Sequence, residues 1–311
     1  MRFDIWPPTT NSSGTLSYLP VFYSIEQEGG VFGANMTKSI EEGKRTGNHN
    51  PVYIDQTNCM GRPNKGKKWW AEELTKYKSN TPLILNISGN SVEEFSRLVN
   101  YYEGIQKELA EQGTELNIIG YELNISCPNI SRDEENASAA ETIGSNPELV
   151  RQVVSSVKAA TSKPIITKIS PASDYVAVAL AAESAGSDYI GCSNTWPTKP
   201  THPEAGVVLT GGGGGKSGPS IKKDNMKIVS EVYQAINNKK TGIIAYGGAV
   251  NFWDIIDYAE QGAEITGFGT GFEYLDDKEI AQRTISDKEN LEAFLDHYQI
   301  KFNDLVGAAH A

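Results

Sequence analysis

The sequence lacks any apolar stretch approaching the roughly 18 residues that a membrane-spanning helix needs. Its first residues, Met-Arg-Phe-Asp-Ile-Trp-Pro-Pro, contain no apolar core of signal-peptide length. These absences predict a cytoplasmic protein that has no contact with a membrane.

Cysteine is also scarce, because the 311 residues contain only Cys59, Cys127 and Cys192. Their number is odd, their spacing is wide and no Cys-x-x-Cys pair occurs. A disulfide framework and a zinc site are therefore both disfavoured. We expect a reducing compartment and no bound metal.

Positive charge is in deficit, since 28 Lys and Arg residues face 39 Asp and Glu residues and give a formal net charge of −11. This balance argues against nucleic acid or an anionic membrane as a partner. The hydrophobic fraction of 39% and the charged fraction of 22% are ordinary for a globular protein. The length suits one large α/β barrel or two ordinary domains.

Strand-like apolar runs alternate with helical patterns along the whole chain, which indicates parallel β/α architecture. The candidate strands are Phe3–Trp6, Val31–Met36, Pro82–Ser88, Gly120–Ile125, Pro164–Ile169, Asp188–Ser193, Gly242–Tyr246 and Glu264–Phe268. The candidate helices are Tyr18–Gln27, Lys67–Lys78, Val92–Gln112, Pro147–Ala160, Asp174–Ala185, Lys223–Asn237, Phe252–Gln261 and Lys278–Tyr298. Without any domain linker, this pattern predicts a single TIM (β/α)8 barrel over residues 1–311, with insertions in the loops at its C-terminal face. A doubly wound open sheet is the alternative.

Two segments, Ser39–Gly66 and Thr195–Ser220, are too long to be simple connections. The second holds Gly211–Gly215, five consecutive glycines that are flexible and costly to order. The run fits a disordered surface loop, a moving lid or a backbone that approaches a ligand, and it does not by itself decide between them.

The most informative stretch is Tyr121–Asn129, Tyr-Glu-Leu-Asn-Ile-Ser-Cys-Pro-Asn. It starts with the apolar–polar alternation of a strand and ends at Pro128, which has no N–H to donate. Cys127 therefore follows the end of a buried strand. A lone cysteine is commonly core filler, but the polar neighbours Asn124 and Asn129 favour a functional thiol.

Other strands also end in polar residues, as expected where a barrel enzyme places its chemistry. These ends are Asn35-Met-Thr-Lys38, Asn86-Ile-Ser88, Asn124, Lys168 and Ser193-Asn-Thr195. The last two strands end in Gly247-Gly248 and Gly269-Thr270-Gly271, which is typical of phosphate binding. We expect a phosphate-bearing ligand in a pocket lined by amides, lysines and a thiol. A barrel aldolase that uses Lys168 as a Schiff-base nucleophile is an alternative.

Several motifs occur in a distinctive order: Asn11-Ser-Ser-Gly14, Thr37-Lys-Ser39, Lys44-Arg-Thr-Gly-Asn48, Asn58-Cys-Met-Gly-Arg-Pro-Asn64, Leu123–Asn129, Lys168, Ser193-Asn-Thr195, Ser217-Gly-Pro219, Gly247-Gly248 and Gly269-Thr270. Taken together, over most of the chain, they resemble the dihydroorotate dehydrogenase family, in its soluble, cysteine-using class 1. Arg62 departs from the family, whose members usually carry a small or apolar residue there.

The resemblance implies FMN-dependent oxidation of (S)-dihydroorotate to orotate in de novo pyrimidine biosynthesis. Cys127 would be the general base, taking a proton from C5 while a hydride leaves C6 for flavin N5. The implied flavin contacts are Ser12, Ser13, Gly14, Lys38, Ser39, Asn124, Lys168, Ser193, Gly218, Gly247, Gly248, Gly269 and Thr270. The implied substrate contacts are Lys38, Asn58, Met60, Gly61, Asn124, Asn129, Asn194 and Thr195.

We expect a homodimer, and Ser217-Gly-Pro219 resembles the NAD-linked subclass that has an iron–sulfur/FAD electron-transfer subunit. Two further alternatives keep the flavin. One is a dihydropyrimidine dehydrogenase-like reductase of uracil, and the other is a flavin-binding module without catalysis.

Overall fold

A computed structural model gives the fold. The structure describes residues 2–16, 18–77, 79–126, 143–198, 201–202, 207–210, 213–236 and 240–311.

In this part of the chain, eight parallel strands form one sheet in the order β1-β14-β13-β8-β7-β6-β5-β2. They are β1 (Thr9–Asn11), β2 (Asn35–Met36), β5 (Leu83–Ile87), β6 (Ile118–Asn124), β7 (Ile165–Lys168), β8 (Tyr189–Cys192), β13 (Gly242–Tyr246) and β14 (Ile265–Phe268). A bridge between Thr10 and Ala34 links the first strand to the residues just before the second. The sheet is thus a nearly closed barrel, and the predicted TIM-barrel architecture is confirmed.

The seam between the short strands β1 and β2 is held by a side chain. The Nδ2 of Asn11 donates to the carbonyl oxygen of Met36 at 2.8 Å, and the N–H of Met36 donates to Oδ1 of Asn11 at 2.7 Å. One buried carboxamide therefore makes the pair of bonds that a neighbouring strand would otherwise make.

The predicted first strand, Phe3–Trp6, is wrong, because the strand lies at Thr9–Asn11. Phe3 instead stacks on Tyr189 with ring centroids 4.9 Å apart. A Cβ on Gly120 would meet the Phe3 ring at 2.8 Å, so a glycine stands where that ring needs room. Phe3 and Ile5 therefore pack against the interior of the barrel rather than pairing in it.

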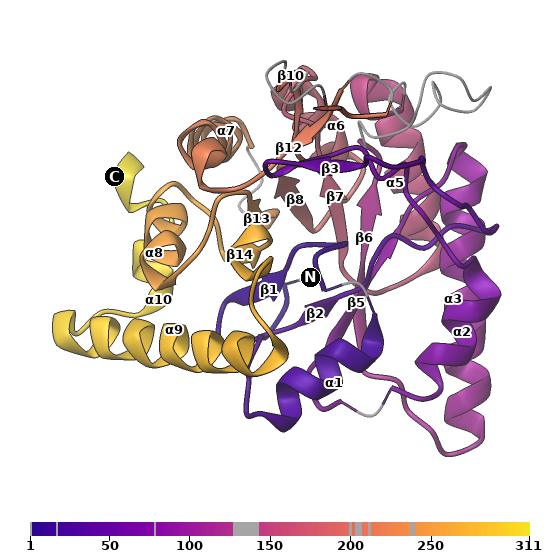
Figure 1. Cartoon of the computed structure of the whole chain (residues 1–311), viewed down its shortest axis with the longest axis horizontal. Coiled ribbons are helices and arrows are strands. Elements are labelled where there is room, and N and C mark those ends of the chain that lie inside the picture. Colours follow the sequence, from indigo (N-terminus) through magenta and orange to yellow (C-terminus); the bar gives the residue numbers. More distant parts are fainter. Residues whose placement is uncertain are drawn as a thin grey trace.

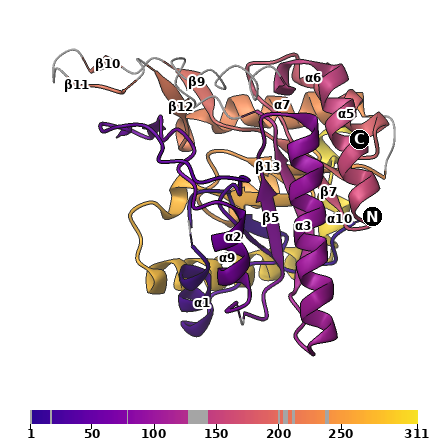
Figure 2. The same ribbon diagram turned by 90° about the vertical axis from the view of Figure 1, so that its right-hand side faces the viewer.

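Helices surround the strands (Figures 1 and 2). They are α1 (Leu19–Gln27), α2 (Lys67–Leu74), α3 (Val92–Glu111), α5 (Pro147–Ala160), α6 (Tyr175–Ser184), α7 (Lys222–Ala235), α8 (Phe252–Glu260), α9 (Asp277–Tyr298) and α10 (Phe302–Leu305), with short 3-10 turns η1 (Pro219–Ile221), η2 (Thr270–Phe272) and η3 (Ala308–His310). Their apolar faces and the outer faces of the strands form one hydrophobic core. Among the helices described, none is long and apolar enough to cross a bilayer.

The two long insertions fold onto each other. Residues 39–66 contain the hairpin β3 (Tyr53–Ile54) and β4 (Thr57–Asn58), and residues 195–220 contain β9 (Trp196–Thr198), β10 (Thr201–His202), β11 (Val207–Val208) and β12 (Gly214–Lys216). Strand β12 pairs with both β4 and β9, which gives a second, antiparallel sheet. Figure 1 shows β3 and β12 lying across one end of the barrel. The end of the glycine run is thus a strand, and a Cβ on Gly214 would overlap the Asn58 carbonyl.

Helices α8 and α9 meet at a buried carboxylate. Asp287 of α9 is 6% exposed, and its Oδ1 accepts from the N–H of Phe252 at 3.0 Å. Burial raises the pKa of Asp287 to about 6, although the Phe252 N–H and Arg283 partly oppose this shift.

We expect the Asp287→Asn variant to change how stability depends on pH. In the folded state Asp287 holds its proton more tightly than in the unfolded chain, so the wild-type protein loses stability as pH rises from about 4 to about 6. Asparagine can still accept from Phe252 but does not ionise. The variant should gain about 1–2 kcal/mol relative to wild type across that window. Urea unfolding at several pH values measures this difference, and a constant difference would contradict the assignment.

Candidate active site

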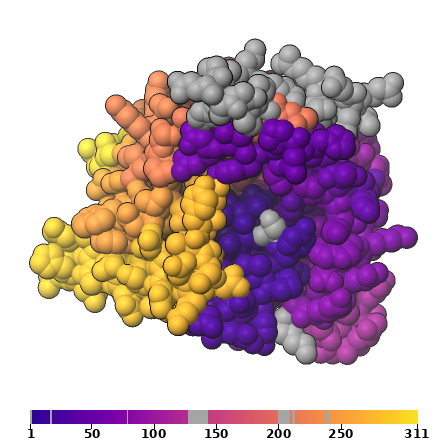
Figure 3. Space-filling model, in the orientation of Figure 1, coloured from indigo at the N-terminus to yellow at the C-terminus, as the bar shows by residue number. Residues whose placement is uncertain are grey.

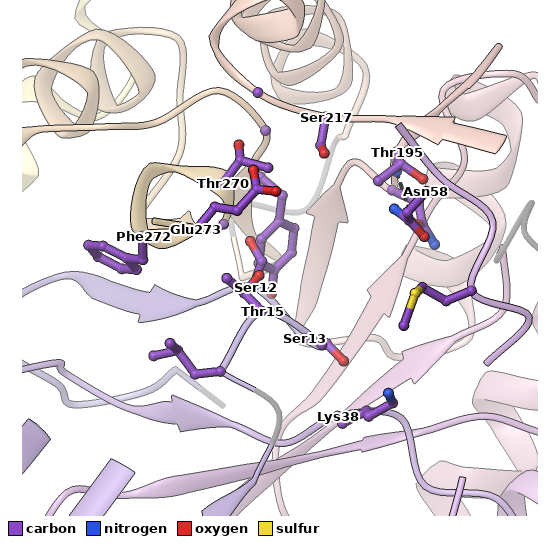
Figure 4. A pocket seen from close by; sticks show the side chains of 18 of the residues that line it. Ser12, Ser13, Thr15, Lys38, Asn58, Thr195, Ser217, Thr270, Phe272 and Glu273 are labelled. Atoms are coloured by element: carbon purple, nitrogen blue, oxygen red, sulfur yellow. Dashed lines mark hydrogen bonds between the residues drawn. The ribbon is translucent and has the colours of Figure 1, made fainter. Parts of the chain in front are cut away.

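A cavity of about 510 Å³ lies at the C-terminal ends of the strands, which is ordinary for a small-molecule site. Figure 3 shows the surface hollowed beside the violet β3–β4 hairpin, where it meets indigo and orange-yellow segments. In Figure 4, Ser12, Ser13 and Thr15 lie next to Thr270, Phe272 and Glu273, with Asn58 and Thr195 across the cavity and Lys38 nearer the barrel strands.

The cavity brings together most of the predicted site residues. Those that line it are Ser12, Ser13, Gly14, Lys38, Ser39, Asn58, Met60, Asn124, Lys168, Ser193, Asn194, Thr195, Gly218, Gly247, Gly248, Gly269 and Thr270. Gly61 does not line it but has a φ of +69°, and a Cβ there would meet the Asn48 side chain at 2.6 Å. Cys127 and Asn129 lie outside the described residues, and so do Gly211 and Gly212. The roles of all these residues remain predictions.

Amides from neighbouring strands form a hydrogen-bonded network in the cavity. The Nδ2 of Asn124 donates to Oγ of Ser39 at 2.9 Å, and the Nδ2 of Asn194 donates to Oδ1 of Asn124 at 3.1 Å. Ser126 donates to the carbonyl oxygen of Lys168 at 2.8 Å, which fixes the residue just before Cys127. The amide edges are therefore held in place, as recognition of a planar polar ring requires.

The ammonium group of Lys38 is available to bind an anion in the cavity. Within the described part of the chain, its ammonium has no hydrogen-bond or ion-pair partner, and burial lowers the pKa of Lys38 below its usual value. Lys38 is half-buried, and a cation that is partly removed from water without a partner is unfavourable. An anionic group bound in the cavity would remove that cost.

Lys168, in contrast, is already paired. Its side chain is 7% exposed, and its Nζ lies 3.5 Å from Oε1 of Glu122 and 4.0 Å from the centroid of the Tyr246 ring. The ammonium therefore lies between a carboxylate and an aromatic face.

The opposite end of the cavity is made of backbone. Gly247 and Gly248 have φ values of +103° and +78°, which favour glycine. Asn225 supports them, because its Nδ2 donates to the carbonyl oxygen of Tyr246 at 2.7 Å and its Oδ1 accepts from Ser193 at 3.2 Å. With Gly269 and Thr270 beside them, this end has the small residues that let a phosphate approach the main chain.

A buried hydroxyl in the cavity lacks a hydrogen-bond partner within the described ranges. The Oγ1 of Thr195 is buried and has no hydrogen bond to any part of the chain that the structure describes. A buried hydroxyl is usually paired, so this atom is suited to a ligand.

The sequence interpretation missed Tyr53, Glu273 and Tyr246 as residues that line the cavity. Tyr53 comes from the first insertion and hydrogen-bonds Glu273, and burial together with this carboxylate raises the pKa of Tyr53. No local sequence pattern predicts the contact between Tyr53 and Glu273, because it depends on how the first insertion folds over η2. Tyr246 did carry a signal, a large aromatic residue directly before Gly247 at a strand end.

Arg62, which departs from the family pattern, is buried in an ionic cluster. Its Nε lies 3.2 Å from Oε1 of Glu41, and its Nη2 donates to Asn90 at 3.2 Å while Nη1 donates to Ser88. Glu41 also pairs with Arg45 at 3.1 Å. Arg62 therefore links the Asn58–Asn64 loop to Ser88 and Asn90, which lie just after β5.

Comparisons with known proteins match this chain to one family over most of its length. The sequence model of the family described as Dihydroorotate dehydrogenase matches residues 8–292. A protein of Archaeoglobus fulgidus described as "Dihydroorotate dehydrogenase B (NAD(+)), catalytic subunit" is 33% identical over 285 residues, covering 90% of this chain and 87% of the relative. Proteins of the same description from Methanothermobacter thermautotrophicus and Citrifermentans bemidjiense are 32% and 30% identical, and each alignment covers 97% of this chain, with 94% and 93% of the relatives.

We expect the Arg62–Glu41 pair to be strongly coupled. Glu41→Gln leaves the buried Arg62 charge without its carboxylate and should lose about 3 kcal/mol of unfolding free energy, whereas Arg62→Met leaves Glu41 paired with Arg45 and should lose less. The double variant should lose clearly less than the sum of the two. Denaturant unfolding of the four proteins measures the coupling. The exposed pair Lys76–Glu73 is the control, with coupling under about 1 kcal/mol, and additive losses at Arg62 and Glu41 would contradict the prediction.

Proposed function

Because the chain belongs to the dihydroorotate dehydrogenase family and its activity is the oxidation of dihydroorotate to orotate, we propose that it works with one non-covalent FMN and with Cys127 as general base. One observation supports this most: the glycine residues of one end, Lys168, and the amide network with Lys38 all line the same cavity. When bound there, FMN accepts the hydride that the substrate loses.

The residues present fit FMN. Gly247, Gly248, Gly269 and Thr270 surround the phosphate, because their backbone allows close approach and Thr270 adds a hydroxyl. Lys168, which lines the cavity, would hold a positive charge near the flavin ring, where a cation stabilises the added negative charge. The other flavin contacts are those that the family resemblance implies, and all of them line the cavity: Ser12, Ser13, Gly14, Lys38, Ser39, Asn124, Ser193 and Gly218.

The substrate lies against the amide network. Lys38 binds the carboxylate, since its unpartnered ammonium lies in the cavity. Amide and hydroxyl groups pair with the ring edges and exclude water from them; they are Asn58, Asn124, Asn129, Asn194 and Thr195, with the backbone at Met60. Gly61, beside Met60, shapes the turn that presents this backbone. Cys127 as thiolate takes the proton from C5, because a thiol with an ordinary pKa of about 8.5 becomes a useful base when nearby lysines favour its ionised form.

The chain acts as a catalytic subunit in the cytoplasm. Its relatives are described as catalytic subunits of NAD(+) enzymes, a description that implies a further subunit. This description supports the proposal that the chain passes its electrons to NAD through an iron–sulfur/FAD subunit. The homodimer is proposed from the family resemblance alone. Ser217-Gly-Pro219, next to the cavity, is the sequence feature that supports this subclass.

The purified protein should be yellow, and dihydroorotate should bleach it without oxygen. Cys127→Ala should retain FMN and orotate binding but slow this reduction by about 10²–10⁴, because only a positioned base is lost. Cys127→Ser should fall between the two. In wild type the rate should rise with pH through one ionisation that Cys127→Ala lacks, as stopped-flow absorbance can measure.

Cys192→Ala is the matched control, because Cys192 is fully buried in β8 and burial raises the pKa of its thiol. It should keep the wild-type pH dependence. A colourless protein that takes up no FMN would overturn the cofactor, whereas near wild-type reduction of Cys127→Ala would place the base elsewhere.

Lys38→Met should weaken orotate binding about 30-fold or more, because the carboxylate loses its half-buried cationic partner. Uracil has no carboxylate, so its binding should change far less. Wild-type orotate affinity should fall as pH rises through the lowered pKa of Lys38, since the free protein then loses the ammonium charge. The absorbance change of the bound flavin reports both titrations. Exposed Lys44 is the control for the same substitution, and equal losses for orotate and uracil would show that Lys38 does not bind the carboxylate.

A further inference from the structure

Tyr246 occupies the interior of the barrel in a space that two glycines leave free. It ends β13 and is 2% exposed. A Cβ on Gly191 of β8 would meet the Tyr246 ring at 3.0 Å, and a Cβ on Gly267 of β14 would overlap it. Both neighbouring strands therefore lack a side chain where the ring lies. This arrangement indicates that the position of the ring is built into the sheet.

The Tyr246 hydroxyl donates to a buried carboxylate. Its partner is Oε2 of Glu122, a residue with no exposed surface. The other oxygen, Oε1, accepts from Nδ2 of Asn86 and lies 3.5 Å from Nζ of Lys168. A carboxylate inside a barrel is expensive unless it is paired. These three partners of Glu122 come from three different strands, β13, β5 and β7.

Lys168 connects this buried group to the cavity. Its Nζ lies 4.0 Å from the centre of the Tyr246 ring, so the same tyrosine contacts both the cation and its counter-charge. Lys168 and Tyr246 line the cavity, whereas Glu122 does not. Among the described residues, Lys168 and Tyr246 are thus the partners of Glu122 that reach the cavity.

We propose that Glu122 and Tyr246 are positioning residues that hold Lys168 in place and set how much of its positive charge reaches the flavin, and thereby set the reduction potential of the flavin. This inference rests on the proposed FMN site. A cation beside the ring favours the reduced, more negative form, so a stronger field makes the potential more positive. Glu122 weakens that field by countering the charge, and the Tyr246 hydroxyl moderates Glu122 by sharing its negative charge.

Two substitutions should therefore move the potential in opposite directions. Tyr246→Phe keeps the ring over Lys168 but removes the bond to Glu122, so the carboxylate counters the ammonium more fully and the potential becomes more negative. Glu122→Gln removes the counter-charge, so at pH 6 the potential becomes more positive. We expect the equilibrium constant for flavin reduction to change about three- to tenfold in each case, or about 15–30 mV for a two-electron couple.

The measurement is the potential of the bound flavin, by anaerobic titration against a reference dye at pH 6. Tyr189→Phe is the matched control, because Tyr189 is a buried tyrosine on the adjacent strand β8 whose hydroxyl accepts from the N–H of Phe3, away from the cavity. It should leave the potential unchanged. A loss of packing alone would not give shifts of opposite sign.

The outcomes separate this inference from the proposed function. Wild-type protein that binds no FMN would overturn both. Wild type that binds FMN and is reduced by dihydroorotate, while Tyr246→Phe has the potential of wild type or of Tyr189→Phe, would overturn the inference alone. If Glu122→Gln does not fold, the sign of the Tyr246→Phe shift still decides, because a potential that is unchanged or more positive contradicts the proposal.

Discussion

Closure of the barrel is the constraint on which the rest of the structure depends. Strands β1 and β2 are short, and the carboxamide of Asn11 supplies both hydrogen bonds that join Asn11 to Met36. Closure brings every strand end to one mouth, because parallel strands point the same way. Ser12, Lys38 and Thr270, far apart in the sequence, then line a single cavity. A carboxamide is well suited to this seam, since it offers one donor and one acceptor in a fixed plane.

In the described part of the chain, the positively charged residues that line the cavity fall into two groups, those paired with a carboxylate and one that is not. Arg62 and Lys168 each have a buried carboxylate within 3.5 Å, so their positive charge is largely balanced. Lys38 has no such partner among the residues that the structure describes. In the free protein, Lys38 is thus available to bind an anion, whereas Arg62 and Lys168 are held by their ion pairs. That division fits a site for a substrate with a single carboxylate, because pairing all the lysines would leave nothing to attract it.

The insertions provide a cover that the barrel alone lacks. Strand β12 pairs with β4 and β9, and this places Asn58, Tyr53 and Ser217 over the strand ends. The wall of the cavity therefore depends on contacts between segments that are more than 150 residues apart, such as the pairing of Asn58 with Gly215. Gly214 has a packing reason to be glycine, since its neighbour is the Asn58 carbonyl.

The sequence by itself determined the barrel, seven of its strands, the capped start of α5 at Asn146-Pro147 and most of the residues that line the cavity. These follow from local causes: hydrophobic period, proline and glycine chemistry, and the rule that strand ends face one mouth. Only the tertiary structure decided that Phe3–Trp6 is not a strand, that Arg62 pairs with Glu41 and that the Lys168 ammonium lies between Glu122 and the Tyr246 ring. Each of these depends on which side chains from distant strands share a buried space. Neither residue type nor spacing along the chain encodes that, because it exists only once the barrel has closed.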